Sequence, residues 1–310
     1  MTHDSVLLQE ALEGLEIQAG DTVVDGTIGG AGHFKAILSN LSKDGTLIGI
    51  DADAEAVVRG REAAKGSEAT VHFVEGNFRS IERHLDGLQI EKIDKALFDL
   101  GWSAYHLSSG RGFSFRVEEP LLMTYGEAEQ GKTAADVINS ATEETLSEIF
   151  HTLGEERFAR PIARGIVRAR DRGRILTTSQ LVDVILESTP SWYHTRRIHP
   201  ATKTFQALRL YVNAELGALR EGLTGAVNRL TSKGRIAVIT FHSLEDRIVK
   251  NFFRDAAHEG VGTVLTKKPI EPSKEELAHN PRARSAKLRI FERNGAHAQV
   301  TNPYTAYAYA

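Results

Sequence analysis

The chain has 310 residues, 41% of them hydrophobic and 25% charged, with a formal net charge of −3, which fits a globular protein with room for a large core or two domains. The absence of cysteine excludes disulfides, thiolate metal sites and a cysteine nucleophile. An acidic N-terminus and the lack of about 18 consecutive apolar residues argue against a signal peptide and a membrane span, so we expect a cytoplasmic protein.

Short apolar runs alternate with helical patterns in the first third of the chain. Between the runs, apolar residues recur three or four positions apart, as on one face of a helix. This alternation predicts an α/β fold with a doubly wound, mostly parallel sheet. The predicted strands are Thr22–Asp25, Thr46–Asp51, Val71–Val74 and Ala96–Leu100.

A long helical insertion follows these strands. The next strand pattern, Arg235–Phe241, comes far later than a parallel crossover requires. Ser140 and Glu143 have capping-box spacing and predict one helix start inside this segment. We therefore expect a first core part at 1–112, an inserted helical domain at 113–207 and a second core part at 208–310. The chain then continues with a helix and two edge strands, predicted at Asp246–Phe253, Thr263–Thr266 and Lys287–Phe291.

The turn after the first strand reads DGTIGGAGH at 25–33 and is suited to a ligand. Glycines let the backbone approach a ligand, and the following helix offers free N–H groups. Asp51, at the end of the second strand, can accept from both hydroxyls of a ribose. The turn lacks G-x-G-x-x-G, and the chain has no P-loop, so the pattern indicates a nucleoside cofactor rather than a dinucleotide or nucleotide triphosphate. A tight turn without a ligand remains the alternative. We place Asp25, Gly30, Ala31, Gly32 and His33 at this site.

Polar and aromatic residues stand at four strand ends: Asp25, Asp51, Asn77 with Phe78, and the run Asp99–Trp102. Ligands of open parallel sheets bind beyond the carboxyl ends of the strands. The coincidence of all four ends strengthens the prediction of one site at this edge.

Asp99 and Trp102 are the predicted reacting residues. Enzymes that methylate nucleobase amines often carry an acceptor, two small or rigid residues and an aromatic at this strand end. An exocyclic amine is a poor nucleophile, so an acceptor for its N–H bonds helps, while an aromatic stacks on the base. A core position for Trp102 is the alternative. Methylation at cytosine C5 normally needs a cysteine that adds covalently to the ring, so the absence of cysteine excludes this reaction. An amine, a ring nitrogen or a hydroxyl remains as the target.

The histidines do not have metal-ligand spacing, so we expect no metal site. Glu245 and Asp246 follow a predicted strand and are expected to cap the next helix. Arginines cluster in three places, and this clustering in an acidic protein favours phosphate contacts over a merely solvated surface. The predicted RNA-binding residues are Arg164, Arg168, Arg196, Arg197, Arg282 and Arg284.

The chain resembles the ribosomal RNA small subunit methyltransferase H family, the MraW-like enzymes that methylate cytosine N4 in 16S rRNA. The resemblance rests on stretches that run in order along nearly the whole chain: HDSVLL at 3–8, DGTIGGAGH at 25–33, EGNF at 75–78, GRGFSF at 110–115, GEERFARPIARGIV at 154–167, HPATKTFQALRLYVNAEL at 199–216, GRIAVITFHSLEDRIVK at 234–250 and NPRARSAKLR at 280–289.

The resemblance implies a class I S-adenosylmethionine-dependent methyltransferase fold with an inserted all-helical domain. It implies methylation of a cytosine amine in the decoding centre, at the P site, with 16S rRNA of the small subunit as partner and a homodimer as one possible assembly. The family's cofactor contacts fall on Ala31, Gly32, His33, Asp51, Phe78, Asp99 and His106.

The chain departs from the family pattern near the predicted site. Ala31 replaces Gly; Trp102, Ala104 and His106 replace Val, Ser and Gln; Leu122 and Thr124 replace Asp and Arg. Two other functions remain open from the sequence: an amino-methyltransferase acting on another RNA or on DNA, and a non-catalytic, cofactor-binding ribosome assembly factor.

Overall fold

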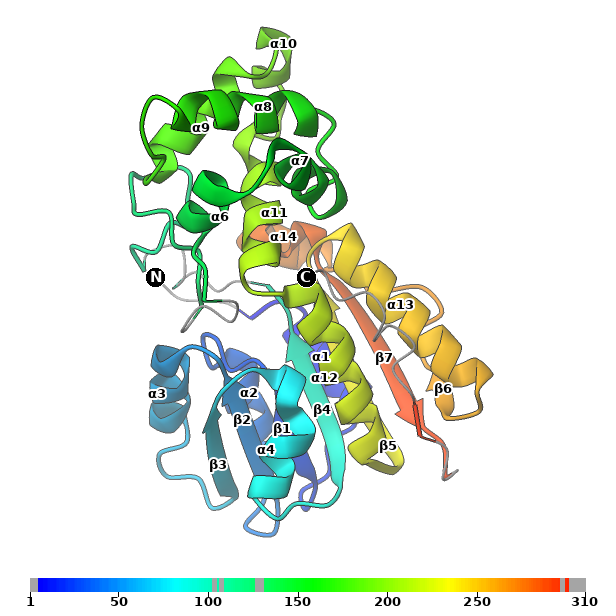
Figure 1. Cartoon of the computed structure of the whole chain (residues 1–310). Coiled ribbons are helices and arrows are strands. Elements are labelled where there is room, and N and C mark those ends of the chain that lie inside the picture. Colours follow the sequence, from blue (N-terminus) through cyan, green and yellow to red (C-terminus); the bar gives the residue numbers. More distant parts are fainter. Residues whose placement is uncertain (1–4, 102–104, 106–108, 126–130, 296–298, 301–310) are drawn as a thin grey trace. The chain divides into compact units, whose positions relative to one another are not determined.

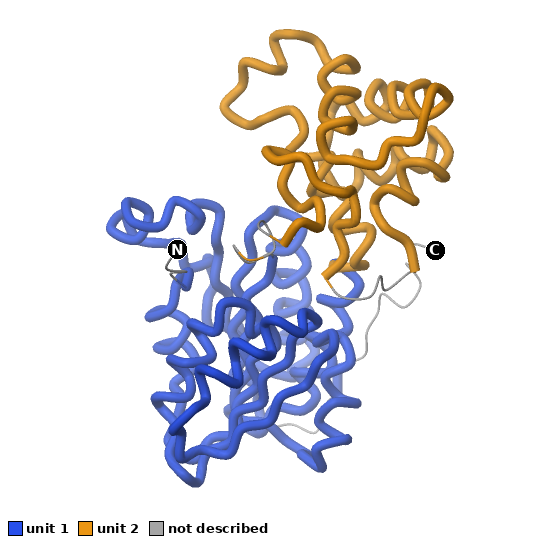
Figure 2. Tube along the Cα trace, turned by 90° about the vertical axis from the view of Figure 1, so that its left-hand side faces the viewer, with its two compact units in different colours: residues 1–101, 216–310 blue, residues 102–215 orange. Residues whose placement is uncertain are grey.

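The computed structural model describes residues 5–101, 105, 109–125, 131–295 and 299–300 (Figure 1). The chain divides into two compact units, Met1–Gly101 with Leu216–Ala310, and Trp102–Glu215 (Figure 2). The sequence placed the insertion at 113–207, and the second unit begins earlier and ends later. Helix α11 (Ala201–Val212) accounts for the later end, because it packs as a whole on earlier helices of that unit.

The first unit is built on a sheet that, over the described residues, has seven strands in the order β3-β2-β1-β4-β5-β7-β6. β1 to β5 are parallel, and β7 runs antiparallel to both of its neighbours. The doubly wound, mostly parallel sheet predicted from the sequence is thereby confirmed. The strands are β1 (Thr22–Asp25), β2 (Thr46–Asp51), β3 (Thr70–Glu75), β4 (Ile93–Asp99), β5 (Leu230–Thr240), β6 (Gly262–Val264) and β7 (Lys287–Arg293).

Helices cover both faces of this sheet because successive strand residues point to opposite sides. Val24 belongs to the core under α4, α12 and α13, whereas its neighbour Val23 belongs to the core under α1, α2 and α3 (Figure 1). The helical elements of this unit are α1 (Leu8–Leu15), α2 (Gly32–Leu38), α3 (Ala54–Ala63), η1 (Phe78–Ser80), α4 (Ile81–Gly87), α12 (Glu215–Arg229), α13 (Ser243–His258), α14 (Lys274–His279) and η2 (Pro281–Ser285).

The second unit is helical where the structure describes it, as the sequence predicted. Phe150, Ile162 and Ile166 are fully buried, and α8 packs between α7 and α9. Besides α11, its helices are α6 (Ala134–Ser140), α7 (Glu143–Thr152), α8 (Ala159–Arg170), α9 (Thr178–Glu187) and α10 (Ser191–His194). In the described part of the chain, no helix combines the length and apolar content needed to cross a bilayer.

Two predicted helix caps had different outcomes. The capping box expected from Ser140 and Glu143 is wrong, because Ser140 ends α6 and its hydroxyl donates back to the Asp136 carbonyl. Thr142 caps α7 instead, accepting from the backbone N–H of Thr145. The cap predicted from Glu245 and Asp246 is confirmed for Glu245, whose carboxylate accepts from the backbone N–H groups that precede α13. Asp246 pairs instead with Arg289 at 2.7 Å.

Candidate functional site

The site begins with the order of the parallel strands. β2, β1 and β4 are neighbours, and Asp25 at the end of β1 pairs in register with Gly49 and Leu97. Asp51 and Asp99 each lie two residues beyond those partners, so they flank Asp25 on either side. Because all three strands run the same way, three carboxylates meet at one edge of the sheet, as the sequence predicted.

The glycine-rich turn after β1 is tied to the strands on both sides. The Gly26 N–H donates to the Leu97 carbonyl at 2.9 Å, and a Cβ at Gly26 would lie 2.5 Å from the Phe98 ring. Thr27 Oγ1 accepts from the Asp99 N–H at 2.7 Å, which fixes the turn to the end of β4. No sequence pattern indicates this role of Thr27, because it depends on contact between residues far apart in the chain.

Gly29 and Ala31 have positive φ angles of 50° and 62°, a region that favours glycine. Ala31 is the N-cap residue of α2, and it adopts this backbone without the freedom that the family's usual glycine would have. Gly30 lies between them and is partly exposed. The turn therefore connects the end of β1 to the first turn of α2 through two residues with left-handed backbone angles.

Asp51 is held by one backbone N–H on each carboxylate oxygen. The Gly29 N–H donates to Oδ2 and the Asp53 N–H to Oδ1, both at 2.9 Å. Burial raises the pKa of Asp51 to about 6, while these two N–H groups act in the lowering direction. Each oxygen keeps a second lone pair for a further donor, so a rigid carboxylate stands ready to accept two hydroxyl groups. Arg59 steadies the turn by donating to the Gly29 carbonyl at 2.8 Å.

His33 and Asp99 form a buried pair. His33 Nε2 lies 3.1 Å from the Val6 carbonyl oxygen, which only accepts, so this nitrogen carries a proton. Nδ1 lies 3.3 Å from Asp99 Oδ2. In a neutral imidazole Nδ1 would then be a bare acceptor facing a carboxylate, so a further proton must lie between the two groups. The sequence pointed to both residues but not to their contact.

Asp25, His33, Asp51 and Asp99 form a cluster of titratable groups, and their charges shift the pKa values of His33 and Asp25. Burial by itself lowers the pKa of His33, but the hydrogen bond and charge of Asp99, with the charge of Asp25, outweigh it and raise that pKa. Burial raises the pKa of Asp25 to about 7, with Asp99 and Asp51 adding to the rise, while His33 and the Thr27 N–H oppose it. A carboxyl that titrates near neutral pH in this position is typical of a functional site.

Two buried oxygens of the cluster lack a partner. Among the described residues, neither Asp25 Oδ2 nor Asp99 Oδ1 has a hydrogen-bond donor. Buried acceptors of folded proteins are nearly always satisfied, so an unpaired pair at one strand edge indicates a site for a ligand that brings donors or positive charge.

For Phe78 and Gly32, two further predicted cofactor residues, the structure shows packing contacts. Phe78 starts η1 and packs its ring 4.9 Å from Phe98, with Gly222 of α12 against it. A Cβ on Gly32 would lie 1.9 Å from Ser5 Oγ, so the N-terminal segment packs closely on the start of α2. Trp102 and His106 lie outside the described residues.

The predicted RNA-binding arginines are all on the surface. Arg164 and Arg168 lie on α8, and Arg164 pairs with Glu143 at 3.3 Å. Arg196 lies over the rings of Trp192 and Tyr193, and Trp192 is 49% exposed. Arg197 in the second unit and Arg282 and Arg284 in η2 of the first unit are exposed as well.

Arg157, which precedes α8, and Arg170, at the end of α8, contact other groups of the second unit. Arg170 donates to the carbonyls of Ile138 and Ala141 and so fastens the end of α6. Arg157 lies over the rings of Phe158 and Trp192. These two side chains have structural contacts that the sequence pattern did not reveal.

The chain is similar to known proteins over most of its length. A model of the MraW methylase family matches residues 1–294. The chain is 45% identical over 308 residues to the ribosomal RNA small subunit methyltransferase H of Syntrophotalea carbinolica, covering 94% of this chain and 98% of the relative. It is 45% identical over 296 residues to the protein of the same name in Deinococcus radiodurans, covering 95% of this chain and 91% of that one.

Among solved structures, a SAM-dependent O-methyltransferase from Thermotoga maritima is similar with a TM-score of 0.45 and 8% identity, covering 96% of this chain and 69% of that one. The fold class is fixed by the sheet order, the antiparallel β7 and the family match: a class I methyltransferase fold with a helical insertion, as predicted. The chain belongs to the MraW methylase family.

Proposed function

We propose that this chain transfers the methyl group of S-adenosylmethionine to N4 of a cytosine in the decoding centre, at the P site, of 16S rRNA. The broader statement follows from the family and its close relatives: the chain is an S-adenosylmethionine-dependent methyltransferase of small-subunit ribosomal RNA. The choice of the cytosine amine and its position are the proposal. The observation that carries it is Asp99, an acceptor at the end of β4 with one unpaired, buried oxygen.

The residues at the sheet edge fit the cofactor. Asp51 would accept from the two ribose hydroxyls, and Asp25 with its unpaired Oδ2 would face the positively charged end of the molecule. The cofactor supplies an electrophilic methyl group on a sulfonium. The remaining proposed contacts come from the turn, from the start of η1 and from the end of β4 with the residues that follow it: Gly30, Ala31, Gly32, His33, Phe78, Asp99 and His106.

Asp99 would orient the amine for attack. The lone pair of an exocyclic amine is delocalised into the base, and an acceptor that holds its N–H bonds favours the pyramidal nitrogen that reacts. On methyl transfer the new N–C bond would replace the C–S bond, the cofactor would leave as a neutral thioether, and the amine nitrogen would lose one proton to water. His33 holds Asp99 in place through their shared proton, so Asp99 presents Oδ1 to the substrate. We propose that Trp102, three residues further along the chain, stacks on the cytosine.

The RNA contacts belong to the same proposal. Arginine binds phosphate oxygens bidentately, and the exposed guanidinium groups on both units suit a long polyanion. We place the RNA on Arg164, Arg168, Arg196, Arg197, Arg282 and Arg284. The working partner would be the small ribosomal subunit in the cytoplasm. Whether the chain acts as a homodimer is decided by light scattering of the purified protein.

Mass spectrometry of 16S rRNA tests the proposal. RNA from cells lacking the gene should lose one methyl group on a cytosine N4, and the wild-type gene should restore it. The Asp99→Asn variant should fail to restore it. Unchanged rRNA in the deletion strain would overturn the substrate. A methyl-transfer assay on small subunits, naked RNA and DNA then separates the three substrate classes, and cofactor binding without transfer to any of them would indicate an assembly factor.

A further inference from the structure

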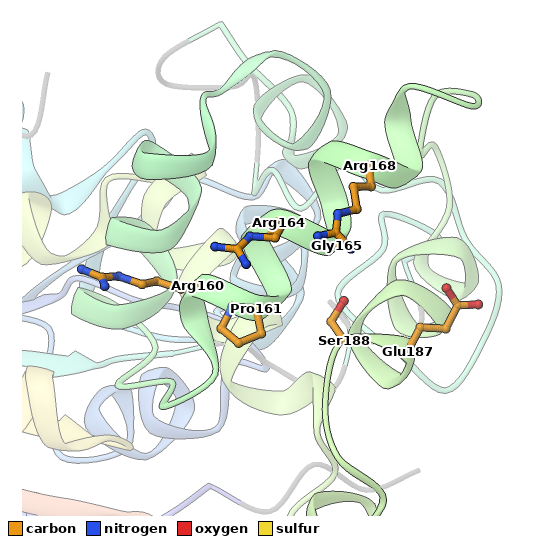
Figure 3. A pocket seen from close by; sticks show the side chains of 7 residues that line it. All are labelled: Arg160, Pro161, Arg164, Gly165, Arg168, Glu187 and Ser188. Atoms are coloured by element: carbon orange, nitrogen blue, oxygen red, sulfur yellow. The ribbon is translucent and has the colours of Figure 1, made fainter.

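A hollow on the second unit lies between α8 and α9 (Figure 3). Its volume is about 440 Å³, within the range of sites that hold small ligands. Arg160, Arg164 and Arg168 follow one another along the α8 side, four residues apart, and Glu187 with Ser188 closes the α9 side. Three arginines and one glutamate are therefore among the residues that line this hollow.

The hollow exists because two helices approach closely at Gly165. A Cβ at this position would lie 1.9 Å from Ser188 Oγ and 3.5 Å from Val184 Cγ1. The glycine brings the end of α9 against the middle of α8, and the long arginine side chains then rise beside the contact. Pro161, Gly165 and Ser188 line the hollow together with the charged residues.

The charged groups do not satisfy one another. Arg164 pairs with Glu143, but the structure gives no acidic partner for Arg160 or Arg168 and no basic partner for Glu187 among the residues it describes. All four side chains are exposed. Arg160, Arg168 and Glu187 are therefore accessible to a ligand that carries both an anion and a hydrogen-bond donor.

We propose that this hollow binds one unpaired nucleotide of the RNA substrate. Arg160 and Arg168 hold the phosphates on its two sides, since eight residues of helix advance about 12 Å and let the two side chains meet different phosphates of one strand. Glu187 accepts from an exocyclic base amine, the contact by which carboxylates recognise cytosine N4. The proposal rests on the proposed function, because that function supplies an RNA partner, and it adds where a strand binds away from the reacting base and which bases are preferred there.

Binding of single-stranded RNA to the full-length protein tests the phosphate contacts. The probes are fluorescent oligonucleotides of adenosine, cytidine or uridine, measured over a series of KCl concentrations. Arg160→Gln with Arg168→Gln should weaken binding about tenfold or more and reduce the slope of log affinity against log salt by about 1.4, that is, roughly 0.7 for each lost phosphate contact. Arg254→Gln, an exposed arginine on α13, is the matched control. A double variant that matches this control overturns the proposal.

Glu187→Gln tests the base contact separately. The wild-type protein should prefer adenosine and cytidine oligonucleotides over uridine, which has no exocyclic amine, and the variant should lose this preference while keeping the salt slope. The same base preference in variant and wild type overturns the contact by Glu187. Methyl transfer to small subunits, measured with the same proteins, tests the proposed function separately from nucleotide binding in the hollow. Failure of the wild type to methylate overturns the proposed function. Unchanged RNA binding by the arginine variants overturns only the proposal that the hollow binds a nucleotide.

Discussion

Replacing Asp25 by asparagine should make the ligand-free protein more stable relative to wild type as the pH rises. Asp25 is fully buried, and its Oδ2 has no partner among the described residues. Burial raises its pKa to about 7. Folding therefore favours the protonated, uncharged carboxyl, and ionisation of this group destabilises the folded state. Asparagine keeps the shape and the oxygen that accepts from the Thr27 N–H, but it cannot ionise.

The size of the effect follows from the two pKa values. The unfolded carboxyl has the ordinary value of 3.8, so wild type loses stability as the pH rises from 3.8 to about 7 and loses no more above that. One pKa unit corresponds to about 1.36 kcal/mol. Integrated from pH 5 to pH 8, the loss is about 2.5 kcal/mol. The asparagine amide adds a buried donor that costs roughly 1–3 kcal/mol, but this cost is the same at every pH and leaves the slope unchanged.

Urea unfolding, followed by circular dichroism at several pH values between 5 and 8, measures this slope. The free energy of unfolding of Asp25→Asn minus that of wild type should rise across the range by about 2.5 kcal/mol. Asp183→Asn, at an exposed position on α9, controls for removal of a charge and should give a constant difference. A constant difference for Asp25→Asn as well would refute the reasoning that burial holds this carboxyl protonated.

Three further changes test the proposed roles. Asp51→Ala should weaken S-adenosylmethionine binding by a few kcal/mol, because two hydroxyls lose a charged acceptor worth roughly 1.5–3 kcal/mol each; unchanged affinity in calorimetry would exclude the ribose contact. Asp99→Asn should lower turnover at saturating cofactor by ~10²-fold or more, and a kcat near wild type would exclude Asp99 from the reaction. Trp102→Ala should weaken RNA binding by about 1–3 kcal/mol, the usual contribution of a stacked base. Equal RNA affinity of variant and wild type in anisotropy titrations would exclude the stacking role.

The parallel strands could be located from the sequence because each is a short apolar run that ends in a polar residue. Thr22–Asp25 and Thr46–Asp51 have the predicted bounds, and the predicted Val71–Val74 lies within β3. Parallel strands present their carboxyl ends at one edge of the sheet, which is why Asp25, Asp51 and Asp99 could be assigned to that edge from the sequence alone.

Contacts between distant residues could not be predicted in this way. Neither composition nor spacing relates His33 to Asp99, since their pairing depends on where α2 lies against the end of β4. The prediction of the α7 cap was wrong for a local reason. Ser140 and Thr142 are both good capping residues, and only the extent of α6 decides which of them precedes α7. The role of Arg170 was hidden as well, because its partners are carbonyls rather than acidic side chains.

The raised pKa of Asp25 predicts that cofactor affinity depends on pH. Asp99 and Asp51 both contribute to raising that pKa to about 7, so Asp25 of the ligand-free site is mostly protonated below pH 7 and mostly ionised above it. A positively charged ligand beside Asp25 favours its ionised form, and binding then releases a proton. Affinity for S-adenosylmethionine should therefore rise from pH 6 towards pH 7.5 and level off above, whereas S-adenosylhomocysteine, which lacks the sulfonium charge, should show little of this rise. Calorimetry of both ligands gives the ratio of their affinities, in which effects common to the two molecules cancel. A ratio that stays flat over this range would mean that Asp25 does not face the sulfonium, and the cofactor would have to be placed differently along the strand edge.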